Sequence, residues 1–120
     1  MHSIKVAYKV WLDSDGKAFG EGPCELLRLV EKTGSLHKAA MEMNMSYRKA
    51  WLTLRASEKR LGFPLLERTV GGTSGGGSSL TPQARRFMKQ YEQFRKDVGQ
   101  AITKIYAKHF GKPRKNTSTP

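Results

Sequence analysis

Two segments with helical periodicity are separated by only three residues near the middle of the chain. This short spacing restricts the possible folds more than any other feature of the sequence. The first segment covers residues 36–43 and the second covers residues 47–61. Ser35 and Ser46 precede the two segments, and their side chains can accept hydrogen bonds from the first amides of a helix. Asn44 tolerates the left-handed backbone that a sharp turn requires. Two helices joined so tightly are typical of a helix-turn-helix.

The residues before this pair predict a strand and a further helix. From Pro23 onward apolar residues recur with helical spacing, and Gly34 provides a stop. Residues 4–12 alternate apolar and polar side chains, which predicts a strand, and residues 13–20 have the composition of a turn. We therefore expect a strand, a turn and a short helix ahead of the helix-turn-helix.

Five glycines occur among the seven residues 71–77, between segments 64–70 and 78–80, which we expect to pair as a β-hairpin. A phosphate loop of the Walker type would need Lys before the Ser, whereas Gly77 precedes Ser78, so this alternative is weak. A linker is a second alternative, because Gly and Ser chains are flexible. We favour the tip of a wing, since glycine lets the backbone approach a nucleic-acid phosphate closely.

A long helix is predicted from Thr81 and Pro82, an N-cap and a first helical residue, to about Phe110. Its apolar residues recur at alternating steps of three and four, as in a coiled-coil seam: Phe87, Tyr91, Phe94, Val98, Ala101 and Ile105. About thirty residues at ~1.5 Å each span ~45 Å, which exceeds one small domain. Phe87 and Tyr91 are therefore expected in the domain core. A homodimer is expected to form through Phe94, Val98, Ala101, Ile102 and Ile105.

The formal net charge is +12, and it is unevenly distributed. Residues 1–33 carry five basic and five acidic residues, residues 34–70 carry seven against three, and residues 71–120 carry ten against two. This basicity predicts a polyanionic partner. Nucleic acid is favoured over a membrane because neither terminus shows a strongly amphipathic basic helix with an aromatic and leucine face.

Several classes of protein are disfavoured by the sequence. Cys24 is the only cysteine, which excludes an internal disulfide, and with His2, His37 and His109 it gives no zinc-ligand spacing. We therefore expect no metal or cofactor, and Cys24 is expected to be buried. No signal pattern and no run of eighteen apolar residues occurs, so we expect a cytoplasmic protein. No enzyme is expected, because no spacing of nucleophile and base is present.

Residues 47–61 divide into two sides when the helix is turned by about 100° per residue. Ala50, Leu54 and Leu61 lie on the side expected to be buried. The opposite side carries four cations and no acid: Arg48, Lys49, Arg55 and Lys59. Such a face suits the major groove, where the fork of an arginine matches guanine O6 and N7. Arg48 and Arg55 are accordingly the first candidates to read bases, and the two lysines are candidates for phosphate.

Other side chains complete the expected DNA contacts. Trp51 and Met43 are assigned to the core where the helices meet, whereas Tyr47 fits either the core or DNA. Hydroxyls and amides at helix starts commonly hold phosphate. The full set of expected DNA contacts is Ser35, Lys38, Ser46, Tyr47, Arg48, Lys49, Arg55, Lys59, Arg68, Thr73 and Ser74.

Three sequence motifs, spread over roughly residues 20–95, resemble one family. A G-S-[IL]-x-x-A-A segment is followed by M-S-Y-[RK]-x-A-W and then by V-E-R-x-x-G-G-x-x-G-G-G. The matching residues are Gly34, Ser35, Leu36, Ala39 and Ala40, then Met45 to Arg48 with Ala50 and Trp51, and then Glu67, Arg68, Gly71, Gly72, Gly75, Gly76 and Gly77. In this order the motifs resemble the N-terminal domain of the ModE family of molybdate-responsive transcription regulators.

The order of elements and this resemblance together imply a mainly α fold with a small β-sheet, a winged helix-turn-helix of the LysR type. We expect this domain over residues 1–80, with the wing at about 64–80, a long dimerisation helix over 81–110 and a disordered basic tail over 111–120. ModE proteins continue into molybdate-binding domains that this sequence does not contain, so no small-molecule effector is expected. The expected function is that of a sequence-specific transcription regulator bound as a homodimer to double-stranded DNA, with an inverted-repeat operator.

Two other functions stay open. The protein could bind nucleic acid without sequence choice, as a nucleoid or RNA-binding protein does, and its affinity would then be equal for any duplex. It could also be a winged-helix module for protein interactions, in which case duplex DNA would not bind at moderate salt.

Overall fold

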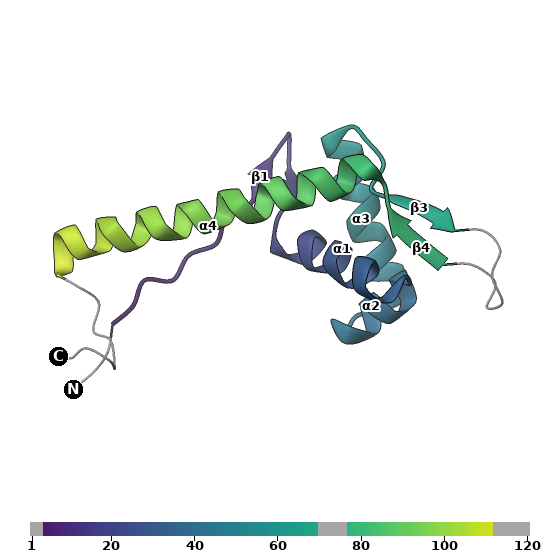
Figure 1. The fold of residues 1–120 in the computed structure, drawn as a ribbon, viewed down its shortest axis with the longest axis horizontal. Coiled ribbons are helices and arrows are strands. Elements are labelled where there is room, and N and C mark those ends of the chain that lie inside the picture. The colour runs from purple at the N-terminus through teal and green to yellow at the C-terminus, as the bar shows by residue number, and fades with distance from the viewer. Residues whose placement is uncertain (1–3, 70–76, 112–120) are drawn as a thin grey trace. The chain divides into compact units, whose positions relative to one another are not determined.

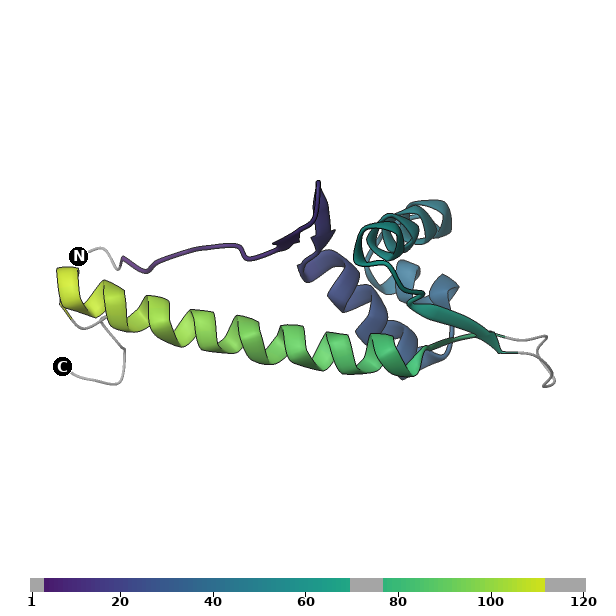
Figure 2. The same cartoon turned by 90° about the horizontal axis from the view of Figure 1, so that it is seen from above.

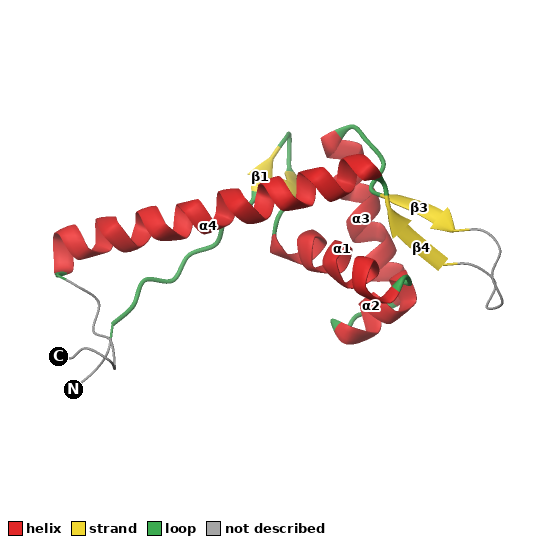
Figure 3. Cartoon of the chain, in the orientation of Figure 1, coloured by secondary structure: helices red, strands yellow, loops and turns green. Residues whose placement is uncertain are grey.

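The computed structural model describes residues 4–69 and 77–111, and helices dominate these ranges (Figure 3). The elements in chain order are β1 (Leu12–Asp13), β2 (Lys17–Phe19), α1 (Glu21–Thr33), α2 (Leu36–Glu42), α3 (Tyr47–Leu61), β3 (Leu66–Thr69), β4 (Gly77–Leu80) and α4 (Pro82–Phe110). They divide into two compact units, one within residues 10–89 and the other formed by residues 4–9 with 90–111. The expected mainly α fold with a hairpin and a long last helix is confirmed.

Local capping chemistry sets the ends of the helices around the turn. The amide of Lys38 donates to Ser35 Oγ over 3.1 Å, and the amide of Lys49 donates to Ser46 Oγ over 3.0 Å. Each serine thus satisfies one amide that the first turn of a helix leaves unpaired. Between the helices Asn44 has a φ of 55°, the left-handed conformation expected for the turn.

Helices α1, α2 and α3 pack together in the first unit, as Figure 1 shows. Among the described residues, the largest fully buried side chains lie here: Phe19, Leu26, Leu27, Leu65 and Val30. On α4, Phe87 lies edge-on to Phe19 and to Phe63, with ring centroids 5.0 and 5.6 Å apart. Phe87 therefore contributes to this core, as expected. Tyr91 is buried, and Cys24 is buried as well.

Strands β3 and β4 pair antiparallel, with Leu66 opposite Leu80, and confirm the expected hairpin (Figures 1 and 2). The hairpin is attached to the end of α1, because the amide of Ser78 donates to the carbonyl of Gly34 over 3.0 Å. A Cβ at Gly77 would lie 2.4 Å from the same carbonyl oxygen, so only glycine fits this approach without a shift. The glycine-rich tip, residues 70–76, lies outside the described residues.

The strand expected over residues 4–12 is wrong apart from Leu12, since no regular element covers residues 4–11. Alternating side chains satisfy only one requirement of a strand, and the backbone also needs a hydrogen-bonding partner. β1 has such a partner over two residues only, in β2. Residues 4–9 belong instead to the second unit, where the Tyr106 hydroxyl donates to the carbonyl of Ile4 over 3.4 Å.

In the second unit Tyr8 lies against the middle of α4. A Cβ at Gly99 would come within 2.4 Å of the Tyr8 hydroxyl oxygen, so the glycine makes room for this ring. None of the helices over residues 4–69 and 77–111 is long and apolar enough to cross a membrane. The tail expected to be disordered lies, from residue 112 on, beyond the described part of the chain.

Candidate nucleic-acid interface

Helix α3 presents a basic surface opposite its buried side. Ala50 and Leu54 are buried, as the helical projection predicts, and Leu61 is half-buried. The four cations expected to face DNA are all exposed: Arg48, Lys49, Arg55 and Lys59. The structure therefore brings these cations together on one exposed helix, the second helix of the helix-turn-helix.

The N-termini of α2 and α3 add polar groups next to this surface. Ser46 and Lys38 are exposed, and Ser35 is half-buried. The oxygens of both serines accept helix amides, and each hydroxyl keeps its proton as a donor. A serine in this position can therefore cap its helix and still donate to a phosphate oxygen.

Tyr47 is a surface residue, with 40% of its area exposed. Its ring stacks on the ring of His37, with centroids 3.9 Å apart and planes 11° apart. The sequence left Tyr47 either in the core or at the surface that faces DNA, and the structure places it at the surface. His37 was not among the expected contacts, and its place one residue after the start of α2 is the only signal that the sequence offered for it.

Trp51 is the clearest correction, because 43% of its surface is exposed although the sequence pattern placed it in the core. Its ring lies 5.3 Å from Cζ of Arg55, one helical turn further along, in a cation–π contact. A position at the edge of the buried stripe explains the difference, since such a side chain can turn either way. Met43, also assigned to the core, is half-buried.

The outward side of α3 has an acidic neighbour that the projection missed. Glu58 Oε1 lies 3.4 Å from Arg55 Nη1, because residues three apart on a helix are neighbours. Glu58 is mostly buried, with 17% of its side chain exposed, whereas the Arg55 side chain is 63% exposed. The side that carries Arg55 is therefore not free of acid.

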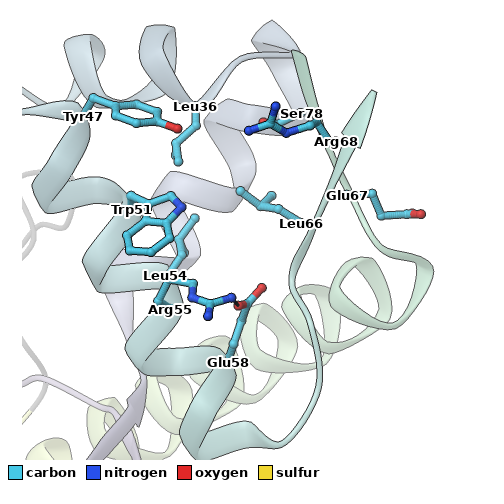
Figure 4. Close-up of a pocket in the computed structure, with 10 residues that line it drawn as sticks. All are labelled: Leu36, Tyr47, Trp51, Leu54, Arg55, Glu58, Leu66, Glu67, Arg68 and Ser78. Atoms are coloured by element: carbon cyan, nitrogen blue, oxygen red, sulfur yellow. Dashed lines mark hydrogen bonds and ion pairs between the residues drawn. The ribbon is translucent and has the colours of Figure 1, made fainter. Parts of the chain in front are cut away.

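A pocket of about 200 Å³ lies between α3 and the hairpin (Figure 4). Its lining comes from α2, α3 and both strands: Leu36, Tyr47, Trp51, Leu54, Arg55, Glu58, Leu66, Glu67, Arg68 and Ser78. Arg68 is exposed on β3. The other two expected wing contacts, Thr73 and Ser74, lie outside the described residues.

The described ranges hold no cluster of three or more His, Cys, Asp or Glu side chains that could bind a metal ion. What the site offers is a helix with four exposed cations on its outward face, two aromatic rings at its side and a hairpin next to it. Cations of this kind neutralise phosphates, and an exposed helix face can reach the edges of bases. The arrangement therefore suits binding to duplex nucleic acid.

Comparison with protein families gives one match, to residues 24–85, which cover α1 through the start of α4. The matching model is that of the bacterial regulatory helix-turn-helix proteins of the lysR family. The match thus includes every described residue of the basic surface.

Curated relatives share this region. The chain is 42% identical over 67 residues to the transcriptional regulator ModE of Haemophilus influenzae, covering 56% of this chain and 26% of that protein. It is 29% identical over 106 residues to the molybdenum transport protein ModE of Azotobacter vinelandii, covering 88% of this chain and 39% of the relative. The chain thus spans between a quarter and two fifths of the length of these relatives.

Among solved structures, the crystal structure of the CbnR_DBD-DNA complex is similar, with a TM-score of 0.58 and 22% sequence identity. The similarity covers 72% of this chain and 94% of that one. At this identity the likeness shows a shared fold.

Proposed function

Because this chain belongs to the lysR family of bacterial regulatory helix-turn-helix proteins, we propose that it is a sequence-specific DNA-binding transcription regulator similar to ModE. The observation that carries the proposal is the exposed face of α3 with its four cations beside the hairpin. The partner is double-stranded DNA, and the protein acts in the cytoplasm. Catalysis has no part in this function.

In this proposal α3 enters the major groove. Arg48 and Arg55 contact bases, since a guanidinium can donate two hydrogen bonds to one guanine. Lys49 and Lys59 contact phosphates as point charges. Hydroxyl and cationic groups around them hold the backbone and position the helix without specifying sequence. These positioning contacts are Ser35, Lys38, Ser46, Tyr47, Arg68, Thr73 and Ser74.

We further propose that the protein is a homodimer joined through α4. On this helix Phe94 and Ile105 are exposed by 45% and 57%. Ala101 is exposed too, and Val98 and Ile102 are half-buried. Apolar residues at steps of four, three and four lie on one helical face, as in a two-stranded coiled coil. A second copy of the chain with the same stripe is the matching partner.

A two-fold dimer predicts the form of the operator. Two copies of α3 related by a two-fold axis contact half-sites about one DNA turn, ~34 Å, or a multiple of it apart. The operator is then an inverted repeat. The molybdenum-related names belong to proteins of which this chain spans at most 39%, so no molybdate response is proposed for it.

Genomic footprinting of the tagged protein, followed by binding to the recovered site, tests the function. Affinity is measured by fluorescence anisotropy for the recovered duplex and for a shuffled duplex of equal composition, each over a range of salt concentrations. We expect a site preference of at least ~10³ and a steep fall of both affinities with salt.

The two other functions predict different results. Equal affinity for the recovered and the shuffled duplex would show a protein that binds nucleic acid without sequence choice. No binding of either duplex at moderate salt would show a protein-interaction module and overturn the proposal.

A further inference from the structure

Glu58 links α3 to the base of the hairpin through both of its carboxylate oxygens. Oε2 accepts a hydrogen bond of 2.7 Å from the amide of Leu65, one residue before β3 begins. Oε1 lies 3.4 Å from Nη1 of Arg55. One side chain therefore contacts both the base of the wing and a candidate base-reading arginine.

The guanidinium of Arg55 has a second neighbour in the ring of Trp51, 5.3 Å from Cζ to the ring centroid. Figure 4 shows Arg55 and Glu58 directed toward one another at one end of the pocket, with Trp51 beside them. The side chain of Arg55 nonetheless stays 63% exposed. The arginine is thus restrained from two sides while it remains accessible to a ligand.

Restraint of this kind affects specific and non-specific binding in opposite ways. A mobile arginine on a basic surface neutralises whichever phosphate is near, which strengthens binding to any sequence. A carboxylate beside it repels phosphate, and a fixed guanidinium loses less conformational entropy when it contacts a base. Because the Arg55 side chain is largely exposed to solvent, the pair changes affinity only slightly. The change is measured best as a difference between the affinities for two duplexes.

We propose that Glu58 is a positioning residue that holds Arg55 for contact with a base and limits its contact with phosphates. The inference rests on the proposed DNA-binding function. Because the same carboxylate anchors Leu65, the position of the wing base and that of Arg55 are linked through one side chain.

The test is Glu58→Gln, which removes the charge and keeps an oxygen that can accept from Leu65. We expect about a two- to fivefold gain in affinity for the shuffled duplex, and no such gain for the recovered site. The salt slope on the shuffled duplex should steepen by about one, since Arg55 then neutralises one more phosphate. Glu67→Gln is the control, because Glu67 is exposed on β3 and Figure 4 shows it directed away from Arg55.

The control removes the same charge, so any gain in affinity and any change of the salt slope should be equal for the two duplexes. A second comparison uses the Arg55→Ala background, where Glu58→Gln should no longer alter the slope. If Glu58→Gln steepens the slope equally with and without Arg55, Glu58 acts only as a general negative charge and the inference is overturned.

A measurement on the free protein separates this inference from the proposed function. NMR relaxation of the Arg55 Nε–Hε group should show a restrained side chain in the wild type and a mobile one in Glu58→Gln. Equal mobility in both proteins overturns the restraint, whatever the DNA results. A wild type without preference for its recovered site refutes the proposed function instead.

Should Glu58→Gln fail to fold, Arg55→Lys provides the second variant. It keeps the charge and loses the planar fork, so we expect lower affinity for the recovered site and unchanged affinity for the shuffled duplex. An unchanged ratio of the two affinities would remove the role of Arg55 in base contact and overturn the inference.

Discussion

At the scale of single residues, two arginines of α3 differ in their surroundings although the sequence treats them alike. Arg48 is exposed in the first turn of α3, two residues after the capping residue Ser46. Arg55 lies two turns further along, between Trp51 and Glu58. The helical projection cannot separate the two, because it records the angle of a residue and not the side chains that turn toward it.

Arg48→Ala tests base contact by the first of these residues. We expect a loss of ~1–3 kcal/mol on the recovered site and a relaxed preference at one base pair. Arg86→Ala removes an equal charge at an exposed position of α4 and should weaken binding to both duplexes equally. The measurement is anisotropy on the recovered site and on single-base variants of it. An equal loss on recovered and shuffled duplexes would reduce Arg48 to a phosphate contact.

Gly77→Ala tests the attachment of the wing to the end of α1. The added Cβ would lie 2.4 Å from the backbone oxygen of Gly34, so β4 must shift, and we expect the free energy of unfolding to fall by ~1–3 kcal/mol. The control is Gly22→Ala in α1, where a Cβ would meet no atom within 4 Å and alanine favours the helix. Urea unfolding measures both variants. If Gly77→Ala has the same free energy of unfolding as the wild type, β4 shifts without loss of stability.

At the scale of secondary-structure elements, the sequence predicts what local chemistry controls. Helix α3 and helix α4 begin and end where serine, threonine, proline and glycine indicate, because caps act within one turn. The strand over residues 4–12 fails because alternation alone does not supply a pairing partner, and of these residues only Leu12 has one, in β2. Trp51 fails for a related reason, since its burial depends on which neighbour covers the edge of the helix.

Thr81 gives a prediction at this scale, because its hydroxyl joins the start of α4 to the segment between α3 and β3. It accepts from the amide of Ala84 over 3.0 Å and donates to the carbonyl of Pro64 over 2.8 Å. Thr81→Val keeps the shape and removes both hydrogen bonds from a buried position, so we expect a loss of ~1–3 kcal/mol in unfolding free energy.

Thr81→Ser is the matched control, because serine keeps the hydroxyl and loses only a methyl group. Its stability should lie close to that of the wild type in the same urea titration. If Thr81→Val, which keeps the methyl group, is as stable as the wild type and Thr81→Ser is not, the methyl contact rather than the capping bonds holds the start of α4.

At the scale of the whole molecule, the cations of α3 and the apolar stripe of α4 serve different parts of the proposed function. The cations serve DNA binding, and the stripe serves dimerisation. The four cations on the outward face of α3 are found from the sequence, since the face on which an exposed charge lies follows from helical periodicity alone. The hydrogen bond between Glu58 and the amide of Leu65 joins α3 to a residue outside it and becomes visible only in the folded chain. The stripe from Phe94 to Ile105 is likewise visible in the sequence, and a second copy of the chain is needed to test it.

Val98→Asp places a charge in the middle of that stripe. Burying an unpaired carboxylate between two helices is costly, so we expect a folded monomer whose affinity for the inverted repeat falls to that of a half-site. Gln100→Asp introduces the same charge at an exposed position of α4 off the stripe and should stay dimeric. Light scattering gives the mass of each variant, circular dichroism confirms that it is folded, and footprinting reports whether one or both half-sites are protected.

A wild type that is monomeric at tens of micromolar, or a Val98→Asp variant that remains dimeric, would place the interface elsewhere. The segment of residues 4–9, which contacts α4 through Ile4 and Tyr8, is then the next surface to test.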